Sequence, residues 1–193
     1  MTEYTDDIRA AIAVLRRGGV ILYPTDTVWG LGCDATDSRA VRRIFDIKHR
    51  ADAKALITLV GSEGQLERTA AGIPDVAWQL IEFSDKPLTI VYDGSNPAAA
   101  IAPELLAADG SIGVRLTREA FSSRLCRDFG KPLVSTSANV SGESTPLCFG
   151  EISPEIVAAV DYVCTSRRDE APAEKASTVM RLQEDGTFKV LRK

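Results

Sequence analysis

Residues 20–32 read VILYPTDTVWGLG, and residues 133–142 read LVSTSANVSG. Each stretch begins as an apolar run and ends abruptly in a segment of hydroxyls, amides and glycines. A buried strand that delivers a polar loop is how an α/β protein places hydrogen-bond donors around a small ligand. The two stretches therefore predict a pair of strands whose polar ends contribute to one pocket.

The rest of the chain alternates between helical and extended patterns. The hairpin pattern at the end of the chain predicts a mixed rather than purely parallel sheet, so we expect an α/β fold of mixed strand direction. The expected helices cover residues 6–17, 37 or 38 to 48, 65–83 with a break at 72–74, 117–130 with Thr117 as the cap, and a segment that begins at 153–155. The expected strands cover residues 20–23, 55–60, 87–92, 111–116, 132–135, 177–182 and 187–191, and the turn 61–64 follows the second of them.

Composition narrows the class of protein. The 193 residues, 45% of them hydrophobic, predict a single domain over residues 1–193. No apolar stretch approaches the roughly 20 residues of a membrane span, and the N-terminus lacks a secretory signal, so a membrane protein is not expected. Four isolated cysteines and one histidine favour neither disulfides nor a zinc site and predict a cytoplasmic protein. A net charge of −4 argues against a protein whose whole surface binds nucleic acid, although it is compatible with a local basic patch.

Three cations, Lys48, Arg50 and Lys54, follow the second predicted helix directly. Such a cluster could bind a triphosphate or an RNA backbone. It could equally be explained by the preference of cations for the C-terminal end of a helix. His49 has no evident partner and is predicted to be a surface residue without a catalytic role.

The polar loops carry the same two kinds of interpretation. Residues 135–142 offer four hydroxyls and one amide, which suit nucleobase edges, phosphates or a carboxylate, but an ordinary turn has a similar composition. Residues 23–32 can likewise be a ligand loop, with Trp29 as a wall, or a plain strand and turn. Arg115 points to the opposite face of its strand from Val114 and Leu116, so it either pairs with a substrate carboxylate or sits on a solvated face.

Several familiar catalytic patterns are absent from the sequence. It contains no GxxxxGK[ST] and no GxGxxG, which excludes an ordinary P-loop and the dinucleotide-binding fingerprint. The single histidine lies in a basic stretch, so no convincing histidine-based triad can be assembled. Any chemistry must therefore rest on binding, orientation and neutralisation of charge.

Taken together, PTDTVWGLG, the K-x-R pair Lys48 and Arg50, KPLTIV, SIGVR and STSANVSG resemble the YrdC/TsaC/Sua5 family in order and spacing. The resemblance runs from about residue 8 to the C-terminus and is closest to the single-domain, TsaC-like type. It implies a twisted open sheet of mixed parallel and antiparallel strands, flanked by helices, with a large concave cavity.

The family resemblance also implies an activity. The chain would be an L-threonylcarbamoyladenylate synthase, a nucleotidyltransferase that converts L-threonine, bicarbonate and ATP into threonylcarbamoyl-AMP and pyrophosphate for the t6A37 modification of tRNA. Mg2+ would arrive with ATP, since no carboxylate cluster in the sequence looks like a metal cage. The implied partners are tRNA and a TsaD-type transferase complex that takes the product onward.

Matched motif by motif, the resemblance assigns roles to individual residues of this chain. Those expected to carry the chemistry, by neutralising charge on the phosphates, are Lys48 and Arg50. Those expected to contact L-threonine are Thr27, Arg115, Ser135 and Ser177. Those expected to contact ATP are Lys48, Arg50, Lys54, Thr89, Ser137, Asn139, Thr145 and Arg192.

The sequence departs from the family pattern in places and leaves alternatives open. Ala51 replaces a common proline, residues 84–87 replace a PGP, and Leu59 falls near a histidine of the longer Sua5 form. One alternative is a non-catalytic, YciO-like protein of the same fold that binds RNA or a nucleotide. A second is a generic nucleotide hydrolase or an enzyme that uses carbamoyl phosphate. A structural interaction module would explain neither the polar strand ends nor the cation cluster.

Overall fold

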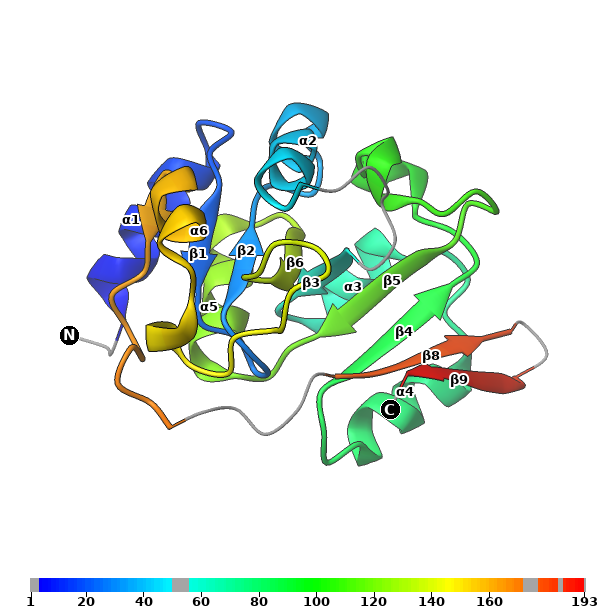
Figure 1. The fold of residues 1–193 in the computed structure, drawn as a ribbon. Helices are drawn as coiled ribbons and strands as arrows, with labels where there is room; N and C mark the ends of the chain where they lie inside the picture. The colour runs from blue at the N-terminus through cyan, green and yellow to red at the C-terminus, as the bar shows by residue number, and fades with distance from the viewer. Residues whose placement is uncertain (1–3, 50–55, 172–176, 184–185, 193) are drawn as a thin grey trace.

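The computed structural model describes residues 4–49, 56–171, 177–183 and 186–192 (Figure 1). Within them, one sheet of nine strands runs in the order β7-β1-β2-β6-β3-β5-β4-β8-β9. The strands are β1 Ile21–Tyr23, β2 Gly30–Gly32, β3 Ile57–Val60, β4 Leu88–Tyr92, β5 Ile112–Leu116, β6 Leu133–Ser137, β7 Tyr162–Val163, β8 Thr178–Leu182 and β9 Phe188–Arg192. The helices are α1 Thr5–Leu15, α2 Ser38–Ile47, α3 Glu63–Thr69, α4 Asp75–Phe83, α5 Ala120–Phe129 and α6 Pro154–Ala159, with short 3-10 turns η1 Pro97–Ala99, η2 Pro103–Leu105 and η3 Phe149–Glu151.

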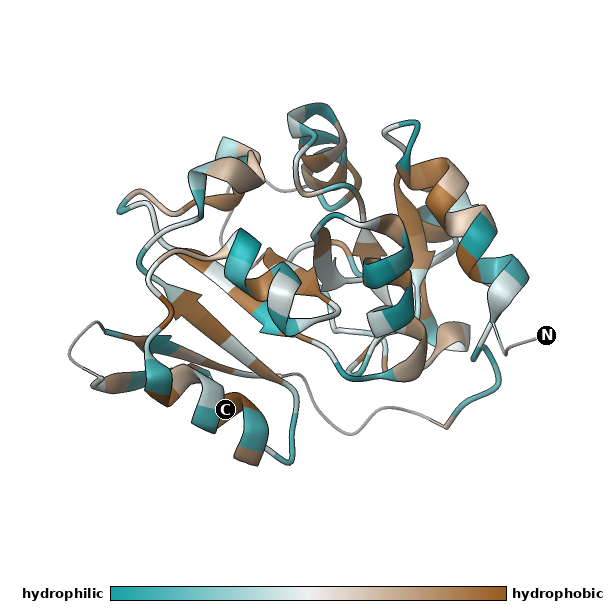
Figure 2. Cartoon of the chain, turned by 180° about the vertical axis from the view of Figure 1, so that it is seen from behind, coloured by the Kyte–Doolittle hydropathy of each residue, from teal (hydrophilic) through white to brown (hydrophobic). Residues whose placement is uncertain are grey.

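Strand directions confirm the expected mixed sheet. The pairs β1–β7, β3–β5 and β4–β8 are parallel, and the remaining neighbours are antiparallel. The apolar strands occupy the middle of the molecule, and helices with polar outer faces flank them (Figure 2). The chain leaves β7 at one edge of the sheet and re-enters at β8 near the opposite edge (Figure 1).

Side-chain caps begin several of the helices. The sequence offered Asp37 or Ser38 as the cap of α2, and the Asp37 carboxylate takes this role by accepting from the backbone N–H of Arg39 and Ala40. The helix 120–129 was expected to start at Thr117, but the Glu119 side chain caps it by accepting from two backbone N–H groups, at 2.8 and 2.7 Å. Glutamate reaches both N–H groups from a position nearer the helix, which leaves the threonine outside it. The predicted turn 61–64 is also shorter than expected, because α3 begins at Glu63.

Strand β2 was not expected, because residues 24–32 were interpreted as one continuous loop. Instead, β1 and β2 form an antiparallel pair in which residues 24–29 are the connection. At Gly32 any side chain would meet the Tyr23 ring, since an added Cβ would lie 2.6 Å from a ring carbon. Strand β2 also pairs with β6, so that Gly30 stands opposite Ser137. The two stretches that predicted the fold therefore lie side by side.

The interior is built mainly from the strands and the inward faces of the helices, with fully buried Tyr23, Leu31, Leu59 and Phe121 among its members. The cysteines are free and, except for the partly exposed Cys148, buried. No helix among the described residues is long and apolar enough to cross a bilayer.

Candidate functional site

A cavity of about 300 Å³ lies where the 24–29 loop, β5, β6 and the loop after β6 approach one another. Its volume falls at the small end of the range of ligand sites, roughly 300–1,000 Å³. Hydroxyls, amides and cations dominate its wall. The described residues that line it are Thr25, Thr27, Val28, Gly30, Lys48, Ile57, Arg115, Ser135, Thr136, Ser137, Asn139, Ser141, Gly142, Thr145, Ser177 and Arg192.

Most of the residues singled out in the sequence meet in this cavity. Thr89 does not line it: its side chain is fully buried, and its hydroxyl lies 3.2 Å from the Ser177 hydroxyl, behind the wall. Arg50 and Lys54 lie outside the described residues. The predicted residues in the lining are Thr27, Lys48, Arg115, Ser135, Ser137, Asn139, Thr145, Ser177 and Arg192.

Lys48 is part of the wall and joins α2 to the loop after β6. Its Nζ donates to the carbonyl oxygens of Ser137 at 2.5 Å and Asn139 at 2.6 Å, and the residue is only 3% exposed. The backbone N–H of Ser141 donates in return to the Lys48 carbonyl at 3.0 Å. The ammonium therefore contacts that turn directly, because the end of the helix packs against it.

Arg115 projects from β5 into the cavity and is 3% exposed. Burial excludes the solvated face that the strand pattern had left open. Its Nη2 lies 3.1 Å from Oδ1 of Asp26, and its buried Nε has no hydrogen-bond partner among the described residues. A buried donor without an acceptor costs roughly 1–3 kcal/mol, so Arg115 offers an unfilled bond to a ligand in this cavity.

A second guanidinium faces the same space from β9. Arg192 donates from Nε and Nη2 to the Ser177 carbonyl, at 3.2 and 3.1 Å, and from Nη2 to the Ser177 hydroxyl at 3.2 Å. Burial, and then the positive charge of Arg115, lower the pKa of Arg192 from its usual value. Two guanidiniums that repel each other across a cavity favour an anion between them.

The 24–29 loop forms a rigid wall. Thr25 Oγ1 donates to the Val28 carbonyl at 2.7 Å and accepts from the Thr27 backbone N–H at 3.0 Å. From outside, Arg167 Nη1 donates to the Thr25 carbonyl at 3.1 Å and pairs with Glu119 at 3.1 Å. The hydroxyl of Thr27 is thereby fixed at the cavity.

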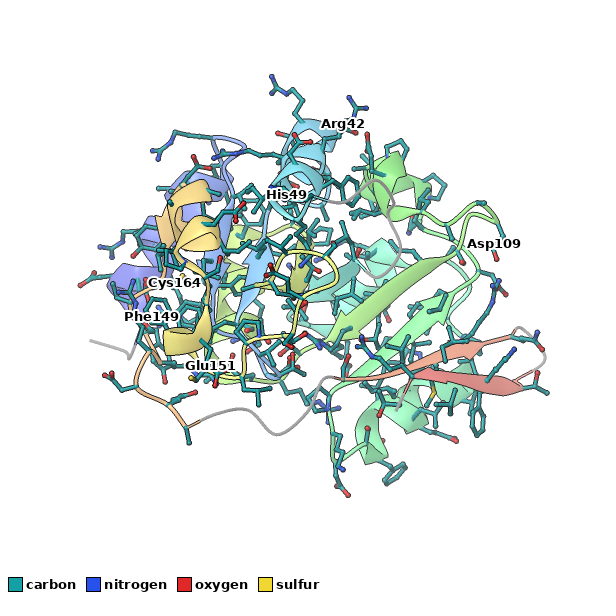
Figure 3. The ribbon with its side chains drawn as sticks, in the orientation of Figure 1. Arg42, His49, Asp109, Phe149, Glu151 and Cys164 are labelled. Atoms are coloured by element: carbon teal, nitrogen blue, oxygen red, sulfur yellow. The ribbon has the colours of Figure 1, made fainter. Side chains whose placement is uncertain are left out.

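The sequence suggested Trp29 as a wall of the ligand pocket, but Trp29 does not line the main cavity. It contributes instead to a second cavity of about 140 Å³ on the other side of the loop. Its ring packs on that of Phe149, which Figure 3 labels, with centroids 4.9 Å apart. The guanidinium of Arg168 covers the Phe149 ring at 4.6 Å. The tryptophan therefore supports the wall from behind.

Internal hydrogen bonds shape the turn after β6. The Ser137 hydroxyl donates to Oδ1 of Asn139. The Asn139 amide nitrogen donates to the carbonyls of Val140, at 3.0 Å, and Glu143, at 2.9 Å. Asn139 thus uses its side chain on its own turn as well as lining the cavity.

No carboxylate belongs to the described lining, and the described residues contain no cluster of three histidine, cysteine or acidic side chains that could hold a metal. The donor set therefore does not fit a resident metal ion. His49 lies at the end of α2, exposed, with its Nε2 3.2 Å from Glu155 (Figure 3), which agrees with its prediction as a surface residue.

Sequence reasoning did not assign Thr136, Ser141, Ile57 or Asp26 to the site. Thr136 and Ser141 belong to the quoted hydroxyl-rich stretch, so the stretch itself was the available signal. Two features arise only in the tertiary structure: the backbone pairing of β2 with β6 and the contact of Asp26 with Arg115. No local sequence pattern predicts them.

Comparisons with known proteins agree with this fold. The Sua5/YciO/YrdC family model, described as "Telomere recombination", matches residues 13–193. The threonylcarbamoyl-AMP synthase of Pseudoalteromonas translucida is 42% identical over 158 residues, which are 80% of this chain and 83% of that protein.

Two solved structures share the fold. E. coli YciO superposes with a TM-score of 0.81 at 26% identity, over 96% of this chain and 88% of that one. P. abyssi Sua5 complexed with L-threonine superposes with a TM-score of 0.78 at 27% identity, over 91% of this chain and 50% of that one, so this chain matches half the length of that protein. The protein therefore belongs to the Sua5/YciO/YrdC family.

Proposed function

We propose that this protein is a threonylcarbamoyl-AMP synthase, which forms threonylcarbamoyl-AMP and pyrophosphate from L-threonine, bicarbonate and ATP. The observation that carries the proposal is the cavity in which the buried Arg115 offers an unfilled donor beside hydroxyls and further cations. The name of the P. translucida relative and the L-threonine complex of P. abyssi Sua5 support the same reaction.

Arg115 is the proposed ligand of the threonine carboxylate. A planar guanidinium recognises a carboxylate through paired N–H donors, and burial strengthens the charge-assisted bonds. The hydroxyls of Thr27, Ser135 and Ser177 line the same cavity and can bond the polar groups of the amino acid. Leu59, near the place of the histidine of longer Sua5 proteins, is fully buried, so the hydroxyls would take over that contact.

The nucleotide is proposed to lie against the turn after β6 and the end of β9. Ser137, Asn139, Thr145 and Arg192 line this part of the cavity, and Lys48 holds the turn in place. Thr89 would act only through Ser177, since it lies behind the wall. Arg50 and Lys54, outside the described residues, remain proposed phosphate ligands because of their charge and position in the chain.

The proposed chemistry has two steps. The threonine amine adds to CO2 derived from bicarbonate and loses a proton, giving a carbamate. A carbamate oxygen then forms a bond to the α-phosphorus of ATP as the bond to pyrophosphate breaks. The protein contributes orientation and positive charge from Arg115, Arg192 and Lys48. Mg2+ would accompany the nucleotide substrate, and holding the labile carbamate in the cavity beside ATP would limit its loss to water.

The product is proposed to serve t6A37 modification of tRNA. A mixed anhydride of a carbamate and a phosphate is readily attacked by water, so a transferase of the TsaD type would have to accept it promptly. The proposal includes no stable complex with either partner.

A YciO-like protein that binds RNA or a nucleotide without turnover is the second candidate. The TM-score of 0.81 with E. coli YciO favours it. The K-x-R pair and the Ser-Ala-Asn triplet in this sequence favour the synthase. A nucleotide hydrolase or an enzyme that uses carbamoyl phosphate would turn over its substrate without needing threonine.

Pyrophosphate release from ATP separates these candidates. A synthase should release pyrophosphate only when L-threonine and bicarbonate are both present. Release that is independent of threonine would point to a hydrolase. Absence of turnover under all conditions, with nucleotide binding retained, would point to the YciO-like candidate.

A further inference from the structure

Asp26 lies next to the main cavity without lining it. Its side chain is 13% exposed and contributes to the walls of two smaller cavities, of about 140 and 190 Å³. The residues described as lining the main cavity include its neighbours Thr25 and Thr27 but not Asp26. Asp26 therefore does not contact a ligand in the main cavity, and it can act on one only through its charge or through another side chain.

That side chain is Arg115. Oδ1 of Asp26 is buried and lies 3.1 Å from Nη2 of Arg115, a side chain that is 3% exposed. The contact is an ion pair without hydrogen-bond geometry, so it acts through charge and proximity. The carboxylate occupies one corner of the guanidinium and leaves Nε without an acceptor among the described residues. Because both side chains are largely buried, the carboxylate balances the charge of the arginine and limits its rotation.

The backbone holds Asp26 firmly in this position. The Ser122 hydroxyl donates to the Pro24 carbonyl at 3.0 Å, and Arg167 donates to the Thr25 carbonyl at 3.1 Å. These two bonds fix the residues that precede Asp26 from α5 and from the segment after β7. A carboxylate on such a rigid support can orient its partner to within a fraction of an ångström, which is the precision that carboxylate recognition requires.

We propose, on the basis of the function proposed above, that Asp26 is a positioning residue that fixes Arg115 for the carboxylate of L-threonine. It thereby makes the site selective for a free carboxylate over an uncharged group at the same position. Two effects oppose each other, because Asp26 also repels the incoming carboxylate. Orientation outweighs repulsion here, because Arg115 is 3% exposed and water cannot hold its guanidinium in place once the Asp26 carboxylate is removed.

The test compares binding of L-threonine with binding of L-threonine methyl ester, which keeps the amine and hydroxyl but lacks the negative charge. Isothermal calorimetry is carried out on the full chain and on Asp26→Asn, which keeps the size of the side chain. The ratio of the two dissociation constants should fall at least about tenfold in D26N, with the dissociation constant for ATP within about twofold. D109N is the matched control, because Asp109 forms an exposed pair with Arg181, at 2.7 Å.

Each result decides the matter. If D26N binds both ligands more weakly by the same factor, or if its affinity for L-threonine rises, Asp26 does not position Arg115 and the inference is wrong. If the unchanged protein itself prefers neither ligand, the proposed function fails together with the inference. Asp26→Ser, whose short side chain cannot reach Nη2, gives the same readout should D26N not fold.

Discussion

The ammonium nitrogen of Lys48 lies 2.6 Å from the carbonyl oxygen of Asn139, so the end of α2 and the turn after β6 form one continuous wall of the cavity. The same nitrogen also donates to the Ser137 carbonyl, and the return bond from Ser141 closes the connection. Lys48 therefore shapes the turn and also places a positive charge at the site.

Replacing Lys48 by alanine should reduce synthesis of threonylcarbamoyl-AMP. Loss of the charge and release of the turn together should remove about 2–4 kcal/mol of transition-state stabilisation, seen as a lower kcat/KM. His49→Ala is the matched control, because His49 is the next residue but is exposed and pairs only at the surface with Glu155. Arg50→Ala should show a loss of the same order. Parental rates in both K48A and R50A would contradict the assigned roles.

Replacing Gly32 by alanine should destabilise the protein. The added Cβ would lie 2.6 Å from a carbon of the Tyr23 ring and 3.1 Å from the Val134 carbonyl, inside a packed core. Overpacking of this kind lowers the free energy of unfolding by about 1–3 kcal/mol, which urea denaturation measures. Gly150→Ala, at a position with nothing within 4 Å of the added atom, should change it by less than about 0.5 kcal/mol. Equal stability of the two variants would mean that the β1–β2 pairing is wrong.

Asp7 should stabilise the fold above about pH 4 and lose that effect in acid. Its carboxylate accepts from the Tyr162 hydroxyl, at 2.7 Å, and from the backbone N–H groups of Thr165 and Ser166. Burial alone would raise the pKa of Asp7, but hydrogen bonds led by Ser166 and Tyr162 outweigh it, and the pKa is lowered. A lowered folded-state pKa means that the unfolded chain binds the proton more readily, so stability falls as the pH is lowered.

At neutral pH, Asp7→Asn should therefore lower the free energy of unfolding by about 2–3 kcal/mol, which appears as unfolding at a lower urea concentration. The gap should narrow as the pH falls below about 4, because Asp7 is then protonated first in the unfolded chain and, at still lower pH, in the folded protein. Asp6→Asn, on the exposed neighbour that pairs with Arg9, is the control and should show little change at any pH. A gap that stays constant with pH would indicate that Asp7 contributes by packing rather than by charge.

Much of the fold could be predicted from local chemistry. The cap at Asp37, the left-handed Gly130 at the end of α5 and the Ser153–Pro154 start of α6 all stand where the sequence places them. Strand β2 could not be predicted in this way, because its residues, Gly30–Gly32, have no strand propensity of their own. It is a strand because β1 and β6 hold it on either side.

The site was predictable in content but not in arrangement. Hydroxyl-rich strand ends and a lysine after a helix identified most of the residues that line the cavity. The ion pair of Arg115 with Asp26 joins β5 to the β1–β2 connection, so it depends on how the sheet assembles. For the same reason, the sequence could not indicate that Thr89 lies behind Ser177 or that Trp29 turns away from the cavity.

The most direct test of the proposed reaction is to follow the carbon of bicarbonate. The protein is incubated with ATP, Mg2+, L-threonine and 13C-labelled bicarbonate in a buffer from which unlabelled CO2 has been removed. The nucleotide products are separated at once and analysed by mass spectrometry. We predict an adenylate that carries both threonine and the labelled carbon, together with an equal amount of pyrophosphate. AMP or ADP as the nucleotide product, with no labelled adenylate at the earliest time points, would contradict the account.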